Sequence, residues 1–432
     1  MRILYLSSSP YLPMRGTGGW CTHIREVVRA MRARGHEVRA VTGEDALSAV
    51  LTAGHAPALR WVVPRPLRQL RRECLELRHD REVLRRAHAA ALGFGPDVVY
   101  ERTASLHLAG ARLAGAFRLP LLVEQNSPQV EERQAQAPMV LAPLARWMER
   151  QTYRAAAAVV TVSSALREYA VGMGAPREIT HVVPNGARPE LFDPALADGA
   201  AVRRRFDLPE RAVVAGFVGA FADWHGLDRL VKAFALAQGD TQDDFYLMLV
   251  GDGPHRPSLQ ALARDLGIRP WVLFTGPVPF ETVPDYLAAM DVAVLPSSNW
   301  YGSPIKIFEY GAMGRAVIGP DTPPVREVMV DEEEGLLIPP GSVEALRAAL
   351  NRLAENRLLR EQLGERFRER VLRQYTWSRV ADRLLAICHE VAPLQGPGVR
   401  GQGSERQGSG RTPRFGGQGG GQKGRGRERC RN

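Results

Sequence analysis

The chain has 432 residues, of which 45% are hydrophobic, and its formal net charge is +10. This length suggests two or more domains, and no apolar run approaches the ~18 residues that are needed to cross a bilayer. The start, Met1-Arg-Ile-Leu-Tyr-Leu6, lacks the long apolar core of a signal peptide, and the four cysteines form no C-x-x-C pair. These features exclude a membrane-spanning or disulfide-built protein, and we expect a cytoplasmic one.

Most of the positive charge lies at the C-terminus. From Gly396 onward the residues are mostly Gly, Gln, Arg and Ser, and nine Lys or Arg against two Glu give this segment a charge of +7. Such a composition cannot bury enough apolar surface to fold, so residues 394–432 are expected to form a disordered, solvated tail. No specific nucleic-acid partner is expected, and an RNA-binding arm is the alternative.

Short apolar runs alternate with longer helical patterns from the first residue to about Pro340. This alternation predicts parallel sheets with helices on both faces. The first set of expected strands comprises residues 3–6, 37–41, 60–63, 97–100, 121–124, 158–162 and 179–183. The second set comprises residues 213–219, 245–250, 272–275, 292–295, 316–318 and 336–338. The prediction is an α/β protein with two doubly wound, Rossmann-like domains facing across a cleft, where ligands of such sheets bind.

The strand at 292–295 leads into a helix that is expected at residues 303–313. Ser303 suits the N-cap, Pro304 suits the first helical position, and Gly314 is placed to end the helix. The N-terminus of such a helix favours an anion, and Lys306 and Glu309 project from one face of it. A solvent-exposed ion pair between these two residues is the alternative interpretation.

Three glycine-rich turns follow other expected strands. Gly18 and Gly19 precede a helix that is expected at residues 22–34, and Gly219 to Gly226 includes Trp224 and His225. Glycines there let backbone N–H groups approach an oxygen-rich ligand, although tight turns also need glycine for conformational reasons. The same two interpretations stay open for Gly251 and Gly253, and His225 is either a ligand-binding residue or a structural hydrogen-bonder.

These motifs resemble the donor site of the family 4 glycosyltransferases, which are retaining enzymes of the GT-B fold. Most members carry two glutamates separated by seven residues; Glu309 matches the second, and Tyr301 stands in place of the first. Ser303-Pro-Ile-Lys-Ile-Phe-Glu-Tyr310 and Trp224-His-Gly226 are similar to a variant subset instead. The resemblance covers almost all of residues 1–393 and implies that a helix at 375–393 returns to the first domain. The other expected regions are an N-terminal acceptor-side domain (1–186), a linker (187–210), a donor-binding domain (211–374) and the tail (394–432).

The resemblance also implies roles for individual residues. Lys306, Glu309 and His225 are expected to be catalytic. The nucleotide-sugar donor is expected to contact Gly219, Trp224, Gly226, Gly251, Gly253, Ser303, Pro304 and Ile305. On the acceptor and diphosphate side the expected residues are Gly18, Gly19, Glu124 and Asn126.

The predicted function is retaining transfer of a sugar from a nucleotide-diphospho-sugar to a sugar, lipid-linked or other hydroxyl acceptor, in polysaccharide or glycoconjugate synthesis. We expect no cofactor and no metal, because no Asp-x-Asp at a strand end is backed by other ligands. The alternatives are a nucleotide-sugar epimerase or hydrolase, and a non-catalytic scaffold that binds nucleotide sugar or RNA. The Arg-rich segment 65–86 also predicts peripheral contact with an anionic membrane, with a solvated helix face as the alternative.

Overall fold

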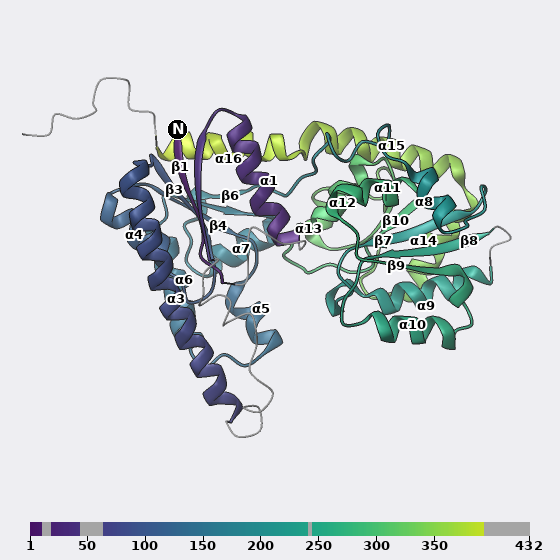
Figure 1. Cartoon of the computed structure of the whole chain (residues 1–432), viewed down its shortest axis with the longest axis horizontal. Coiled ribbons are helices and arrows are strands. Elements are labelled where there is room, and N and C mark those ends of the chain that lie inside the picture. Colours follow the sequence, from purple (N-terminus) through teal and green to yellow (C-terminus); the bar gives the residue numbers. More distant parts are fainter. Residues whose placement is uncertain (11–18, 44–63, 241–243, 393–432) are drawn as a thin grey trace, which may run out of the picture. The chain divides into compact units, whose positions relative to one another are not determined.

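The computed structural model describes residues 1–10, 19–43, 64–240 and 244–392, which contain two parallel β-sheets with helices on both faces (Figure 1). We call the first sheet with its helices the N-terminal lobe and the second the C-terminal lobe. The predicted tail, Gly18 and the expected strand at 60–63 lie outside the described residues. Both predicted doubly wound sheets are confirmed.

The first sheet has six parallel strands in the order β2-β1-β3-β4-β5-β6. Its central strands are buried along their whole length, because helices cover both faces, and this is why they read as continuous apolar runs. The strands are β1 (Arg2–Ser7), β2 (Glu37–Thr42), β3 (Val98–Arg102), β4 (Leu121–Gln125), β5 (Ala158–Thr161) and β6 (Thr180–Val182).

Helices cover the two faces of this sheet unequally. One face packs against α1 and α16, and the other against α3, α4, α6 and α7. The bounds are α1 (Gly19–Ala33), α3 (Arg65–Phe94), α4 (Ala109–Phe117), α5 (Gln129–Gln136), α6 (Ala142–Ala155), α7 (Ser164–Gly172) and α16 (Trp377–Val391). Helix α1 begins three residues before its predicted start, so Gly19 is itself its first residue.

The second sheet has six parallel strands in the order β12-β11-β10-β7-β8-β9. They are β7 (Val213–Val218), β8 (Phe245–Val250), β9 (Val272–Gly276), β10 (Val292–Val294), β11 (Ala316–Pro320) and β12 (Leu336–Ile338). Strand order reverses at β7 and β10, and ligands of open α/β sheets bind beyond the carboxyl ends of strands at such a point.

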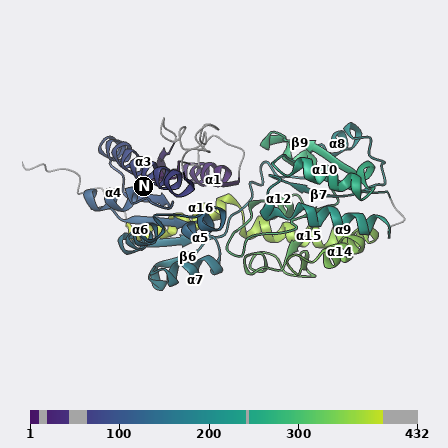
Figure 2. The ribbon, with the colours of Figure 1, turned by 90° about the horizontal axis from the view of Figure 1, so that it is seen from below.

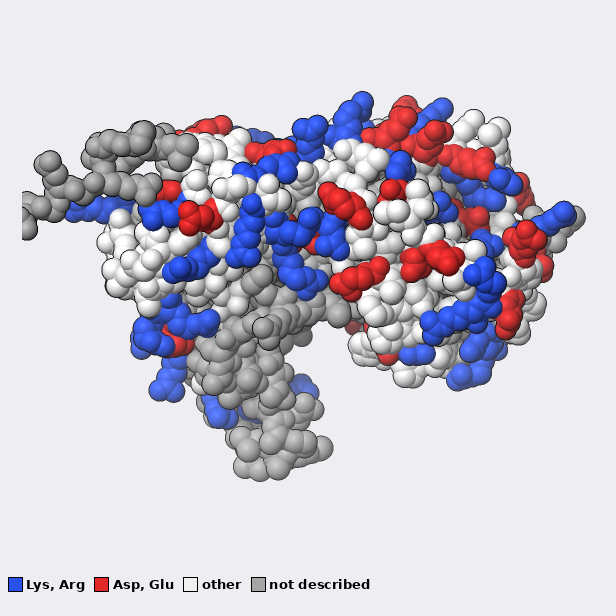
Figure 3. Space-filling view, turned by 45° about the horizontal axis from the view of Figure 1, so that its top comes forward, with Lys and Arg blue, Asp and Glu red and all other residues white. Residues whose placement is uncertain are grey.

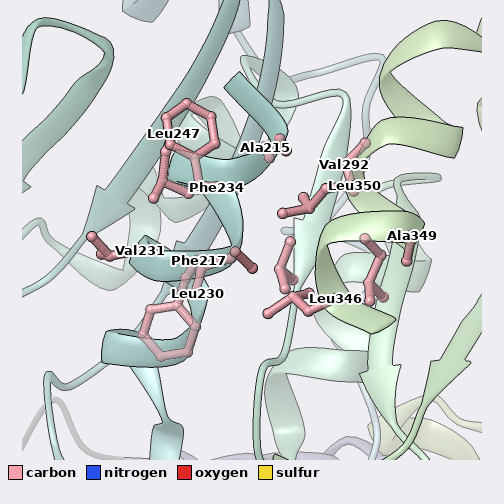
Figure 4. Close-up of a cluster of buried hydrophobic side chains, with 14 of the residues drawn as sticks. Ala215, Phe217, Leu230, Val231, Phe234, Leu247, Val292, Leu346, Ala349 and Leu350 are labelled. Carbon is pink, nitrogen blue, oxygen red and sulfur yellow. The ribbon is translucent and has the colours of Figure 1, made fainter. Parts of the chain in front are cut away.

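Eight α-helices and three 3₁₀ turns of the described chain belong to the C-terminal lobe or to the segment leading into it. The α-helices are α8 (Gly199–Arg205), α9 (Leu227–Gln238), α10 (Arg256–Asp265), α11 (Val283–Ala288), α12 (Ile305–Ala312), α13 (Pro323–Arg326), α14 (Val343–Glu355) and α15 (Arg357–Gln374). The 3₁₀ turns are η3 (Asp223–His225), η4 (Arg269–Trp271) and η5 (Phe280–Thr282). Figure 4 shows side chains of α9 and α14, such as Phe234 and Leu350, gathered with those of β7 and β8 in one core. This core holds β7 and β10 in place, and the loops that follow these strands carry the predicted donor residues.

The chain passes between the lobes twice, and the two passages are hydrogen-bonded to each other. The amide of Ala187 donates to the carbonyl of Tyr375 at 2.9 Å, and the amide of Trp377 donates to the carbonyl of Ala187 at 2.9 Å. After this crossing, α16 runs beside α1 and buries Trp377 and Leu384 in the core of the N-terminal lobe (Figures 1 and 2). The residues predicted to be a linker are therefore partly buried structure, since Ala187 and Phe192 are almost fully buried.

Among the described residues, none of the helices is both long and apolar enough to cross a membrane.

Candidate active site

The start of α12 differs from its prediction. Pro304, with φ −71° and ψ 113°, is the N-cap, and no side chain caps the helix. The predicted cap, Ser303, is occupied elsewhere, because its Oγ accepts a hydrogen bond from the backbone N–H of Asn185 at 3.0 Å. The first N–H groups of α12 are therefore left without a side-chain cap, which is the arrangement that an incoming anion can satisfy. Gly314, with φ 63°, follows the last turn as predicted.

Lys306 lies in the first turn of α12 and reaches back to the loop after β7. Its Nζ lies 3.1 Å from Nε2 of His225 and 4.5 Å from the ring centroid of Phe217. Gly219 is next to it, because a Cβ built on this glycine would lie 2.9 Å from the same Nζ. Three predicted site residues from two loops thus meet around one ammonium group.

Burial sets the ionisation of this group. It lowers the pKa of Lys306 to about 7, with Glu309 acting in the opposite direction. Burial, followed by the charge of Lys306, lowers the pKa of His225 to about 3, so this imidazole is neutral at pH 7. Its Nε2 can then accept from Lys306, and its Nδ1 is buried without a hydrogen-bond partner among the described residues. The positive charge of the site therefore comes from Lys306, and His225 offers one unused N–H.

The glycines of the two turns after β7 and β8 are needed to bring their backbones together. Gly219 has φ 148° and Gly251 has φ 132°, and a Cβ on Gly251 would lie 2.0 Å from the carbonyl oxygen of Gly219. A Cβ on Gly253 would lie 2.5 Å from the carbonyl oxygen of Phe221. This contact explains Gly251 and Gly253 by close backbone packing, and their contact with a nucleotide stays a prediction. Gly226, at φ 62°, begins α9 in a left-handed conformation.

Glu309 does not form the exposed ion pair that was the alternative interpretation. The residue is only 8% exposed, and no ion pair joins it to Lys306 among the described residues. Burial raises the pKa of Glu309 to about 7. The charge of Lys306 lowers this pKa, the charge of Glu26 raises it, and the charge of Arg188 lowers it. Arg188 lies 3.3 Å from Glu26. One turn below Lys306 there is thus a buried carboxyl group close to the ion pair of Glu26 and Arg188, which the sequence did not predict.

Glu124 and Asn126 lie at the end of β4 in a closed hydrogen-bonding cluster. The Glu124 side chain accepts from the Tyr100 hydroxyl and from Nδ2 of Asn126, and its Oε1 lies 2.5 Å from Nε2 of His23. Burial opposes the charge of Glu124, but His23 and Arg102 lower its pKa to about 2. Glu124 is 1% exposed, so its carboxylate is held as a fixed internal charge rather than presented to solvent.

His23 joins this cluster to the start of α12. Its Nδ1 lies 2.7 Å from Oδ1 of Asn185, and Nδ2 of Asn185 donates to the carbonyl of Ser303 at 2.6 Å. Because Asn185 uses its amide nitrogen on Ser303, its oxygen faces His23, and Nδ1 of His23 is the donor. His23 and Asn185 therefore connect Glu124, predicted on the acceptor side, to Ser303, predicted on the donor side. Neither His23 nor Asn185 was among the predicted site residues.

Two further predicted site residues, Gly19 and Trp224, are exposed. Gly19 is exposed, and a Cβ on it would lie 4.0 Å from Cδ1 of Ile305, so the starts of α1 and α12 face each other. Trp224 is 46% exposed, and its ring centroid lies 5.8 Å from that of His225. His23, Asn185, Glu26 and Arg188 belong to the site although the sequence did not single them out. The one available signal is polar residues next to glycine at strand ends, as in Pro184-Asn-Gly-Ala-Arg188, where the sequence predicts the boundary between the first domain and the linker.

Within the described parts of the chain there is no group of three or more His, Cys, Asp or Glu that could hold a metal ion.

Comparison with known proteins identifies relatives of both lobes. A family model described as "Glycosyl transferase 4-like domain" matches residues 18–186, and one described as "Glycosyl transferases group 1" matches residues 212–356. The chain is 28% identical to the alpha-D-kanosaminyltransferase of Streptomyces kanamyceticus, over 72% of this chain and 78% of that protein. It is 27% identical to the GDP-mannose-dependent alpha-(1-6)-phosphatidylinositol monomannoside mannosyltransferase of Mycobacterium tuberculosis, over 89% of this chain and 97% of that protein.

The fold is similar to that of solved glycosyltransferase structures. The crystal structure of Anabaena HepE in complex with UDP superposes with a TM-score of 0.67 at 18% identity, covering 90% of this chain and 100% of that chain. This similarity confirms the predicted GT-B arrangement of two parallel-sheet domains.

Proposed function

The chain belongs to the group 1 glycosyltransferases, and on that basis we propose that it is a retaining, family 4 enzyme. The donor would be a nucleotide-diphospho-sugar and the acceptor a hydroxyl group. Two similar proteins support this donor class, because one is GDP-mannose-dependent and the structure of another contains UDP. Synthesis of a polysaccharide or glycoconjugate is the process that we propose for it.

The observation that carries the proposal is the position of Lys306 at the uncapped start of α12, against Gly219 and His225. A diphosphate there would accept from the free N–H groups of the helix and from the Lys306 ammonium. The neutral His225 would add the N–H of Nδ1. These hydrogen-bond donors are fixed before the nucleotide sugar binds, so they can stabilise the charge that develops on the leaving diphosphate.

In the proposed reaction the acceptor oxygen bonds to the anomeric carbon while the bond from that carbon to the phosphate oxygen breaks. The acceptor proton passes to the departing phosphate oxygen on the same face, which retains the configuration. Glu309 would hold a hydroxyl of the sugar or ribose, and Glu124 would orient His23 near the acceptor. We propose that Lys306 and the α12 N-terminus supply the charge stabilisation that many transferases obtain from a divalent metal ion.

A panel of nucleotide sugars tests this proposal. We expect one of them to raise the melting temperature of the protein and to be consumed when acceptors are added, with the anomeric configuration of the product equal to that of the donor by NMR. Activity should persist in EDTA. An inverted product would overturn the retaining mechanism, and loss of activity in EDTA that Mg²⁺ or Mn²⁺ restores would overturn the metal-free one.

One observation favours a second candidate, a nucleotide-sugar epimerase or hydrolase. Such an enzyme needs an acid and a base that titrate near neutral pH, and the pKa values of Lys306 and Glu309 are both about 7. Incubation of the stabilising nucleotide sugar without acceptor separates the two functions. Complete conversion to an epimer or to free sugar at the rate of transfer would favour this alternative over a transferase.

A further inference from the structure

Tyr301 connects the segment before α12 to the N-terminal lobe. This residue lies between β10 and α12, three residues before the N-cap Pro304, and only 7% of it is exposed. Its ring packs against Val162, which follows β5, and against Leu166 of α7. The side chain therefore extends from the C-terminal lobe and is buried against the N-terminal one.

Two polar groups of Tyr301 bond to helices of the N-terminal lobe. The hydroxyl donates to Oε1 of Glu132 on α5 at 2.7 Å, and it accepts from Nδ2 of Asn299 at 3.0 Å. The backbone carbonyl accepts from Oγ of Ser163, the N-cap of α7, at 2.7 Å. Burial, followed by the hydrogen bond to Glu132, raises the pKa of the Tyr301 hydroxyl, so this group stays protonated and keeps donating at neutral pH.

The two helices that hold Tyr301 are themselves fixed within the N-terminal lobe. On α5, the residue after Glu132 is Arg133, which forms an ion pair with the buried Glu76 of α3. On α7, Oγ of Ser163 also accepts from the backbone N–H of Leu166 at 3.1 Å and so caps the helix. Because both supports are anchored, the hydrogen bonds to Tyr301 restrain the segment before α12.

The contact of Tyr301 differs from the ion pairs at the surface. On the face of the molecule that Figure 3 shows, Lys and Arg lie beside Asp and Glu over both lobes. Exposed pairs of this kind are screened by salt and contribute little to stability. Tyr301 and Ser163 are 7% and 1% exposed, so their hydrogen bonds are shielded from water and salt. The link is therefore suited to fixing a position.

We propose that Tyr301 is a positioning residue for Lys306. Glu132 and Ser163 hold Tyr301 in place, and five residues further on the first turn of α12 places Nζ of Lys306 3.1 Å from Nε2 of His225. The inference rests on the proposed function, in which this ammonium group neutralises the diphosphate of the donor. The lobe that is predicted to bind the acceptor thus helps to form the donor site of the other lobe.

Amide hydrogen exchange of the full chain tests the link without any ligand. Tyr301→Phe keeps the ring and removes the hydroxyl, and the protection of the α12 amides should fall by at least about tenfold. Tyr169→Phe is the matched control, because Tyr169 packs beside the same cluster and its hydroxyl bonds to Glu131 and Glu149 within the N-terminal lobe. Unchanged protection in Tyr301→Phe, or an equal loss in Tyr169→Phe, would overturn the proposal.

The reactivity of Lys306 reports on the same link. The chain has three lysines, and Lys232, which forms an exposed pair with Asp228, serves as the internal reference. Competitive labelling with an amine-directed reagent, followed by mass spectrometry, gives the rate at Lys306 relative to Lys232. We expect this ratio to rise at least about threefold in Tyr301→Phe, because a less restrained α12 exposes the ammonium group more often. A ratio equal to that of the parent protein would show that Tyr301 does not act through Lys306.

Binding of UDP and GDP, used as probes in isothermal titration calorimetry, measures the effect on the donor site. Tyr301→Phe should weaken binding of the preferred probe by about tenfold. Glu132→Gln keeps an oxygen acceptor for the hydroxyl and should stay within about threefold of the parent protein, whereas Glu132→Ala should lose as much as Tyr301→Phe. The double variant Tyr301→Phe, Glu132→Ala should bind no more weakly than either single variant, because both changes remove one hydrogen bond. Additive losses would contradict the link.

The measurements separate this inference from the proposed function. If the parent protein binds neither probe, the proposed donor site fails, and hydrogen exchange and lysine labelling alone decide whether Tyr301 positions Lys306. If the parent protein binds a probe and Tyr301→Phe binds it equally well despite faster exchange in α12, Tyr301 has a structural role only and the inference is wrong.

Discussion

Asn185 and Ser303 are 118 residues apart and form two hydrogen bonds, from the Asn185 backbone N–H to Ser303 Oγ at 3.0 Å and from Asn185 Nδ2 to the Ser303 carbonyl at 2.6 Å. Both residues are buried. The pair fixes the residue before the N-cap of α12 to the end of the first lobe, and the other side of the Asn185 amide holds His23. The segment that carries Lys306 is thus positioned by the N-terminal lobe as well as by its own.

Asn185→Ala should lower the free energy of unfolding by about 2–4 kcal/mol, because it leaves the Ser303 carbonyl and Nδ1 of His23 buried without a partner. Urea unfolding followed by tryptophan fluorescence measures the change. Asn351→Ala is the control, since this amide bonds to Asp240 in an exposed position, and the expected effect is within about 0.5 kcal/mol. Equal stabilities of the two variants would contradict the importance of the link.

Lys306→Ala should weaken binding of the nucleotide sugar by about 30- to 1,000-fold, or about 2–4 kcal/mol, because it removes the charge that faces the diphosphate. Isothermal titration calorimetry gives the dissociation constant. Lys232→Ala is a suitable control, as this lysine forms an exposed pair with Asp228 on α9. A dissociation constant unchanged by Lys306→Ala would remove Lys306 from the donor site.

The affinity for a nucleotide sugar should fall as the pH rises above 7. Burial lowers the pKa of Lys306 to about 7 in the free protein, and a bound diphosphate favours the charged form, so binding takes up a proton above this pH. The donor keeps its own charge, because neither phosphate has a second ionisable proton. Below pH 7 the ammonium is already present and the affinity levels off; above it, the loss is up to about tenfold per pH unit.

Two variants assign this titration. Glu309, whose pKa is raised to about 7 by burial, becomes negative over the same range and acts in the same direction. In Glu309→Gln the dependence on pH should persist through Lys306, whereas in Lys306→Arg it should be reduced to the part that Glu309 contributes. A dependence that is unaltered in Lys306→Arg would show that Lys306 does not titrate there. The rate at which an amine-directed reagent modifies Lys306, one of three lysines in the chain, provides a direct check.

Glu309→Gln and Glu309→Ala should lower kcat by about 10- to 100-fold, since a hydrogen bond from a sugar hydroxyl to a charged acceptor is worth about 1.5–3 kcal/mol. Steady-state kinetics of transfer give kcat and KM for both variants. Glu355→Gln, on the exposed side of α14, is the control and should behave as the parent protein. Parent-like kcat in both Glu309 variants would leave this carboxyl group without a role in turnover.

Gly251→Ala should destabilise the protein and weaken donor binding together. The added Cβ would lie 2.0 Å from the Gly219 carbonyl oxygen, so the loop that borders Lys306 must move. Gly115→Ala is the matched control, because no atom lies within 4 Å of its built Cβ inside α4, and it should gain about 0.5–1 kcal/mol of stability. Calorimetry and donor titration of both variants measure the two effects. Normal donor affinity in a destabilised Gly251→Ala protein would confine that glycine to a structural role.

Local sequence signals were sufficient for the elements and insufficient for their contacts. Continuous apolar runs located the strands of both sheets, since a strand buried on both faces leaves that pattern by itself. Ser303-Pro304 carried the local signal of a helix cap, but Asn185 competes for the Ser303 hydroxyl in the folded chain. For α3 the sequence showed mixed charges without showing that Glu73, Glu76 and Asp80 face inward.

By itself the sequence determined two doubly wound domains, because hydrophobic periodicity and turn residues act over a few positions along the chain. The expectation that Gly219 and His225 belong to one site with Lys306 came from the family resemblance. Only the tertiary structure decided that His23 and Asn185 connect Glu124 to α12. It also decided that burial lowers the pKa of Lys306 and raises that of Glu309, in each case to about 7. The physical reason is that hydrogen-bond partners and burial depend on which distant segments meet. The pKa of a side chain responds to these surroundings and not to the residues next to it in the sequence.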